Sequence, residues 1–232
     1  MTGYGWSGHS LGQAYKSECP PDIIETGGFQ VSNSDHVFID LNPFIAEKAG
    51  LEEDLYPGLL RVARHNRMLP GLPIEVSPPL IMYNKAMFDR AGLSYPEETW
   101  TWDDMVTLAK QLTIRDGQGV ASQFGFGLGA DIEWFEPFVM RNGGSYISSD
   151  GSTARGYVDS PTTIDAFRRI IDAYRVQHII RKPGEPSSAI DQHDESAMTF
   201  CFAWDIPHYK LDGRYGVIGF TKMPGVPLHK RA

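Results

Sequence analysis

Two tryptophans and the acidic residues beside them form the most suggestive combination in this chain. Trp134 and Trp204 each follow an expected strand, and Asp131, Glu133 and Asp205 lie within a few positions of them. A flat indole ring presents a polarised face to the C–H groups of a sugar, and carboxylates accept hydrogen bonds from its hydroxyl groups. This combination predicts a carbohydrate-binding pocket. The alternative is that both indoles only pack in a core or at its rim.

Glu133 and Glu136 permit a second chemistry. Three positions apart on a helix, their Cβ atoms would lie roughly 5 to 6 Å from each other, close to the separation of the two carboxyl groups in retaining glycosidases. Exposed acidic pairs are common on helices, where each is usually only solvated. We therefore expect no catalytic residue and keep glycoside hydrolysis as an alternative.

Two further patterns are incomplete. The run Gly-Phe-Gly-Leu-Gly-Ala at 125–130 fits a dinucleotide-binding pattern, but its glycines fall inside an expected strand. We interpret them as positions that a ligand or another backbone approaches closely. The acidic and histidine residues at 191–195 match half of a zinc-deaminase signature and lack its cysteine half. The sequence predicts no metal site and no cofactor.

Composition limits the possible partners. The chain has 232 residues, 41% of them hydrophobic, which is enough to bury a substantial core. A formal net charge of −8 argues against nucleic-acid and anionic-membrane partners. We expect Cys19 and Cys201 to be buried free thiols without a disulfide between them. No apolar stretch is long enough to span a membrane, and the N-terminus lacks the basic and apolar regions of a signal peptide.

The expected elements alternate between strands and helices, which predicts an α/β fold with a largely parallel sheet. Ligands in such folds sit beyond the carboxyl ends of strands, here after Ile24, Leu128 and Phe202. The helix after Thr101 has the spacing of a capping box, and Ser160 is the expected cap of the next-but-one helix. The expected strands cover residues 23–25, 72–76, 80–83, 124–128, 198–202 and 215–220, and the expected helices cover 43–49, 54–65, 102–112, 132–142 and 161–174.

The segment 78–92 marks a boundary. It begins with Pro78 and Pro79, continues as an apolar strand to Tyr83, and ends in a short helical turn closed by Gly92. Such a strand crosses from one structural unit into another. We therefore expect a crossing near residues 77–82 that separates a first lobe, residues 1–80, from most of a second lobe, residues 81–232.

The order of short motifs along the chain resembles the sugar-type extracellular solute-binding proteins of ABC importers, the group that includes maltose-binding protein. The order of the motifs along the chain carries the resemblance. The motifs are Pro-Asp-Ile-Ile at 21–24, Asp-Leu-Tyr-Pro at 54–57, Gly-Leu-Pro at 71–73, Tyr-Asn-Lys at 83–85, Thr-Trp-Thr-Trp-Asp-Asp at 99–104, Asn-Gly-Gly at 142–144, Glu-Ser-Ala-Met at 195–198, Tyr-Gly-Val at 215–217 and Met-Pro-Gly at 223–225.

The resemblance implies a two-lobed periplasmic-binding-protein-like fold that closes on a sugar or oligosaccharide by a hinge motion. It also implies ABC permease subunits as partners, only peripheral association with the membrane, and a periplasmic or extracellular location. By motif matching, the implied ligand-binding residues are Trp204 as a stacking platform, Trp134, Glu133 and Asp131 as the wall and hydroxyl acceptors beside it, and Gly28, Phe29 and Ser77 facing them from the first lobe and the crossing.

The chain also departs from the family pattern. Family members usually carry an export signal, a first strand and helix before residue 21, and a long C-terminal part after Met223. We therefore expect an incomplete fold that lacks the first strand and helix and the C-terminal third, with Tyr83 to Phe220 as its better-formed half. Two alternatives stay open: a non-sugar ligand such as a polyol, peptide or sulfonate, and a chain that only packs with another subunit.

Overall fold

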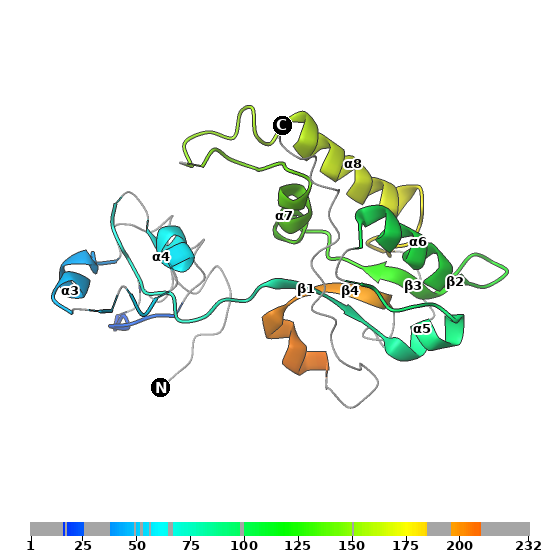
Figure 1. Ribbon diagram of the computed structural model, residues 1–232, viewed down its shortest axis with the longest axis horizontal. Helices are drawn as coiled ribbons and strands as arrows, with labels where there is room; N and C mark the ends of the chain where they lie inside the picture. Colours follow the sequence, from blue (N-terminus) through cyan, green and yellow to red (C-terminus); the bar gives the residue numbers. More distant parts are fainter. Residues whose placement is uncertain are drawn as a thin grey trace. The chain divides into compact units, whose positions relative to one another are not determined.

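The computed structural model describes residues 16, 18–25, 38–48, 50–51, 53–55, 57–64, 67–97, 100–149, 151–184 and 196–209. The chain divides into two units, residues 1–76 and residues 77–232 (Figure 1). The predicted lobes 1–80 and 81–232 stay a prediction. The expected strand at 215–220, the patch at 191–195 and the candidate site residues Gly28 and Phe29 lie outside the described residues.

The first unit contains two short helices, α3 (Asn42–Ala46) and α4 (Pro57–Ala63). Both helices were predicted, and both are shorter than expected. Ile45, Leu60 and Leu69 form a small buried cluster between them. The Asp40 carboxylate accepts hydrogen bonds from the backbone N–H groups of Leu69 and Asn42, each at 3.0 Å, and these bonds lower its pKa.

Two expected strands of the first unit are wrong. Residues 23–25 and 72–76 form no strand, and the side chains of Ile23 and Ile74 are 90% and 77% exposed. A strand needs a neighbour to satisfy its backbone N–H and C=O groups. No strand among the described residues pairs with either segment, so apolar composition alone does not make them strands.

The second unit is built on a mixed sheet. Among the described residues its strands are β1 (Pro79–Tyr83), β2 (Ile114–Arg115), β3 (Ala121–Gly127) and β4 (Ser196–Phe202), in the order β1-β4-β3-β2. Only β3 and β4 are parallel. The predicted largely parallel sheet is therefore wrong. The tight turn between β2 and β3 can join only antiparallel strands, and β1 runs antiparallel to β4.

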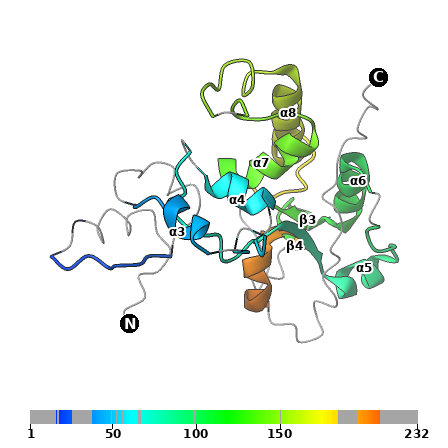
Figure 2. The same cartoon turned by 60° about the vertical axis from the view of Figure 1, so that its left-hand side comes forward.

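Helices cover both sides of this sheet. Helices α7 and α8 lie on one side and the 3-10 helix η2 lies on the other (Figures 1 and 2). The predicted capping box is confirmed, because the Thr101 side chain accepts the Asp104 N–H while the Asp104 carboxylate accepts the Thr101 N–H. Ser160 caps the next-but-one helix as predicted. The helices of the unit are α5 (Lys85–Ala91), α6 (Trp102–Leu112), α7 (Ile132–Arg141), α8 (Pro161–Arg175) and η2 (Ala203–Tyr209).

The main core lies between the sheet and helices α6, α7 and α8. Phe126, Phe138 and Phe200 are buried at its centre. A Cβ atom at Gly125 would lie 1.9 Å from the carbonyl oxygen of Ala109, so α6 crosses β3 where no side chain fits. This confirms the close-approach interpretation at Gly125, where the approaching group is a backbone. Gly127 and Gly129 instead lie against the side chains of Ser196 and Trp134.

The two cysteines have different environments. Both are free, as predicted, and Cys201 is fully buried in β4. Cys19 is exposed, so the prediction that it is buried is wrong. Residues 18–20 form no helix or strand and are exposed, so none of the described residues covers this thiol. In the part of the chain that the structure describes, no helix is long and apolar enough to cross a membrane.

Candidate ligand-binding site at one edge of the sheet

The sheet topology gathers three separate segments at one edge. Strands β3 and β4 are parallel, so both end there, and the antiparallel β1 begins there because Pro79 lies opposite Phe202. Residues that precede β1 or follow β3 and β4 therefore come together. Ser77, Trp134 and Trp204 occupy these positions, as expected for residues at the carboxyl ends of strands.

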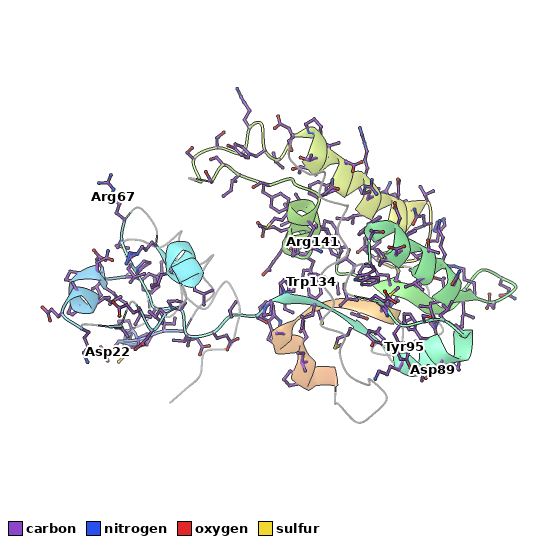
Figure 3. All side chains as sticks on the ribbon, in the orientation of Figure 1. Asp22, Arg67, Asp89, Tyr95, Trp134 and Arg141 are labelled. Carbon is purple, nitrogen blue, oxygen red and sulfur yellow. The ribbon has the colours of Figure 1, made fainter. Side chains whose placement is uncertain are left out.

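Three aromatic rings form what we call the aromatic platform: Trp134, Phe202 and Trp204. The rings of Trp204 and Phe202 are stacked, with centroids 4.5 Å apart and an angle of 23° between their planes. Trp134, which is labelled in Figure 3, contacts Phe202 edge to face at 5.7 Å and also contacts the core residue Phe200 at 5.4 Å. The residue Trp204 is 38% exposed, whereas Phe202 is 8% exposed. The platform thus joins a buried base to a solvent-facing indole.

Hydrogen bonds fix the outer end of the platform. The backbone N–H of Trp204 donates a hydrogen bond to the Ser77 hydroxyl oxygen at 2.8 Å. The neighbouring backbone N–H, that of Ala203, donates to the Pro78 carbonyl at 3.1 Å. The Phe202 N–H donates to the Asp205 carboxylate at 2.9 Å. The segment leading into β1 is therefore tied directly to the backbone that carries Trp204.

Asp131 and Glu133 lie at the start of α7. The Asp131 carboxylate accepts the backbone N–H of Glu133 at 3.0 Å and so caps the helix. Glu133 is exposed in the first helical turn, where the positive end of the helix dipole favours an acidic side chain. Both side chains sit within one turn of Trp134, and both offer carboxylate oxygens as hydrogen-bond acceptors.

Glu136 and Tyr146 extend this acidic region. Partial burial raises the pKa of Glu136, and the neighbouring Glu133 raises it further. Burial, followed by the charges of Glu136 and Asp131, raises the pKa of Tyr146 to about 12. The Tyr146 hydroxyl donates to the Ile132 carbonyl at 2.9 Å. This region can therefore accept hydrogen bonds from a ligand and disfavours added negative charge.

Sequence reasoning missed one residue of the platform. Phe202 was expected only as the last residue of a strand, yet it links Trp134 to Trp204. Its position two residues before Trp204 was the available signal, and the structure places Trp204 just beyond the strand, in the first turn of η2. Asp205 was expected as an acidic neighbour of Trp204. In the structure one of its carboxylate oxygens accepts a hydrogen bond from the Phe202 N–H.

The comparison with protein families gives one clear match. Residues 12–227 match the family model described as bacterial extracellular solute-binding protein. The chain therefore belongs to this family. The predicted periplasmic or extracellular location agrees with the description of the family.

Individual relatives are more distant. The chain is 23% identical over 172 residues to the sn-glycerol-3-phosphate-binding periplasmic protein UgpB of Agrobacterium fabrum, covering 72% of this chain and 34% of the relative. It is 25% identical over 171 residues to UgpB of Brucella abortus, covering 68% and 38%. The chain thus spans little more than a third of the length of the curated relatives it matches.

Solved structures show the same fold. The GacH receptor of Streptomyces glaucescens matches with a TM-score of 0.71 at 20% identity, covering 94% of this chain and 56% of that chain. UgpB of Mycobacterium tuberculosis, solved with glycerophosphocholine, matches with a TM-score of 0.69 at 18% identity, covering 90% and 52%. The predicted α/β fold of the two-lobed periplasmic-binding-protein type, of which this chain covers part, is confirmed.

Proposed function

We propose that this chain is the carbohydrate-binding component of an ABC import system, binding a sugar or oligosaccharide by hinge closure of two lobes. In such a mechanism the ligand makes contacts in the closed form that the open form lacks, and this difference in affinity drives closure. ABC permease subunits are the proposed partners. The proposal includes a periplasmic or extracellular site of action and contact with the membrane only through the permease.

The aromatic platform carries this proposal. An exposed indole stacked on a buried ring offers a flat, rigid apolar face, and acidic acceptors lie within one helical turn of Trp134. This combination suits the alternating C–H and hydroxyl surfaces of a sugar ring. GacH of Streptomyces glaucescens was solved with acarbose, and the maltose/maltodextrin-binding domain MalE of Bdellovibrio bacteriovorus with maltotriose. The ligands of these two similar proteins also favour a carbohydrate as the ligand of this chain.

Each predicted site residue keeps a proposed role. Trp204 would stack on the sugar, Trp134 would form the adjoining wall, and Asp131 and Glu133 would accept hydrogen bonds from hydroxyl groups. Ser77, at the crossing between the lobes, would face these residues. From the first lobe, Gly28 and Phe29 would complete the site.

Isothermal titration calorimetry with a panel of monosaccharides, disaccharides and malto-oligosaccharides tests the proposal. We expect saturable binding of at least one member, and Trp204→Ala should weaken it by about tenfold or more because the stacking surface is lost. Tyr157→Ala is the matched control, since Tyr157 is also 38% exposed and lies outside the platform. A folded chain that binds no member of the panel would contradict the proposal.

Glycoside hydrolysis is the second candidate, and the raised pKa of Glu136 beside Glu133 is the observation in its favour. Family membership favours binding over turnover. Incubation with oligosaccharides followed by product analysis separates the two. We expect no cleavage; turnover that Glu136→Gln abolishes would establish the hydrolase instead.

A further inference from the structure

The start of α7 is the element of this sheet edge that would ordinarily hold an anion. Backbone N–H groups and the helix dipole make the N-terminus of a helix a natural phosphate site. Here the Asp131 carboxylate already occupies that position, accepting the Glu133 N–H at 3.0 Å, and Glu133 adds a second carboxylate in the first turn. An incoming phosphate would have to displace one negative charge and approach another.

The start of η2 is also satisfied from within the protein. The N–H groups of Phe202, Ala203 and Trp204 donate to the Asp205 carboxylate, the Pro78 carbonyl and the Ser77 hydroxyl. The three successive backbone N–H groups at the end of β4 therefore already have hydrogen-bond acceptors within the protein. The same contacts place a further carboxylate, that of Asp205, beside the aromatic platform.

The charge of the surrounding segments has one sign. Residues 77–79, 127–137, 144–149 and 203–207 contain no lysine and no arginine, and the basic residue of α7, Arg141, lies in its last turn, at the other end of the helix from Trp134. They contain four carboxylates, Asp131, Glu133, Glu136 and Asp205. The raised pKa values of Glu136 and Tyr146 arise from burial and from neighbouring acidic groups. This edge therefore presents acceptors and negative charge around an aromatic face.

We infer that the aromatic platform is selective by charge: it takes uncharged carbohydrates or those that carry a protonated amine, and it rejects phosphorylated and carboxylated ones. This inference rests on the proposed function and specifies its ligand class. Hydroxyl and ammonium groups donate to carboxylates, whereas a phosphate only accepts and is repelled. The selectivity differs from that in the names of the UgpB relatives, which specify sn-glycerol 3-phosphate.

Titration calorimetry with matched ligands tests the inference. The probes are the best-binding neutral sugar of the panel, its 2-amino-2-deoxy form and its 6-phosphate, with glycerol and sn-glycerol 3-phosphate as a second pair. We expect the phosphate to bind at least about tenfold more weakly than the neutral sugar. This is the factor for a unit charge roughly 6 Å from two carboxylates in a mostly aqueous medium. The amine should bind at least as tightly as the neutral form, and high salt should reduce both differences.

A charge-matched pair of double variants separates a local effect from net charge. Glu133→Gln with Glu136→Gln should reduce the discrimination against the phosphate by at least about threefold. Glu97→Gln with Asp172→Asn removes the same charge from exposed positions elsewhere and should leave the discrimination unchanged. Circular dichroism of both double variants checks that they remain folded.

The outcomes distinguish this inference from the proposed function. Equal or tighter binding of the phosphate, or unchanged discrimination in the folded Glu133 and Glu136 double variant, overturns the charge selectivity while the sugar assignment stands. Binding of sn-glycerol 3-phosphate without any neutral sugar overturns both. Absence of all binding overturns the proposed function and this inference with it.

Discussion

The hydrogen bond between Ser77 and Trp204 gives the sharpest single test of the platform. Ser77→Ala removes the acceptor of the Trp204 N–H, which lies 2.8 Å from the Ser77 hydroxyl. A neutral hydrogen bond contributes about 1 kcal/mol net, and water can reach this partly exposed site. We therefore expect the free energy of unfolding in urea to fall by about 1 kcal/mol.

The effect on affinity follows from the exposure of the indole. A tryptophan side chain has roughly 250 Å² of surface, and 38% of Trp204 is exposed, so a ligand can cover about 95 Å². At about 25 cal/mol per Å² this contact is worth at most about 2.4 kcal/mol. Loosening the indole without removing it should forfeit part of that, so Ser77→Ala should weaken sugar binding by about threefold to tenfold.

A double-mutant cycle distinguishes a positioning role from direct contact with the ligand. If Ser77 acts by holding Trp204, adding Ser77→Ala to Trp204→Ala should change the affinity by less than about twofold, because no indole remains to be held. Calorimetry of the four proteins measures this, with Ser94→Ala as an exposed serine control. Equal losses of affinity in both backgrounds, with unchanged stability, would refute the positioning argument.

Three further predictions concern packing, pH and thiol chemistry. Gly125→Ala should lower the free energy of unfolding by about 3 kcal/mol or more, because its Cβ would overlap the α6 backbone; Gly117→Ala, which has open space around it, should be nearly neutral in the same urea titration. Hydrogen bonds within the capping box lower the pKa of Asp104, so its contribution to stability is present above the ordinary carboxyl pKa and is lost as pH falls through the lowered one. Melting temperatures from neutral to acidic pH should therefore fall less steeply in Asp104→Asn, and an equal slope would contradict this. Burial raises the pKa of the Cys201 thiol to about 12, so a thiol reagent should label only Cys19 in the native chain and both after denaturation.

Local features of the fold were predictable because neighbours in sequence determine them. The capping box at Thr101 and the Ser160 cap depend on side chains and N–H groups only three positions apart. The positions of Trp134 and Trp204 after strands also followed from the pattern, and the structure places both at the same edge through Phe202.

The predictions that were wrong concern strands, which depend on residues far away in the sequence. Apolar residues such as Ile23 and Ile74 suit a strand, but a strand exists only where another strand pairs with it. The antiparallel direction of β1 could not be predicted either, because its partner β4 lies more than a hundred residues further along the chain. The internal use of Asp131, as a helix cap, could be suspected from its position, whereas the bond from Trp204 to Ser77 could not.

The pairing of β1 with β4 has a consequence for the newly made chain. Within the described residues β1 pairs with no other strand, so its backbone groups stay open until Phe202 has been synthesised. Closing so long a loop is entropically costly, and folds dominated by such distant pairings form slowly. During synthesis β1 therefore keeps unpaired backbone groups until β4 has been made, which leaves an open strand edge for that time. The same pairing that later supports Trp204 thus delays completion of the sheet until residues 196–202 have emerged.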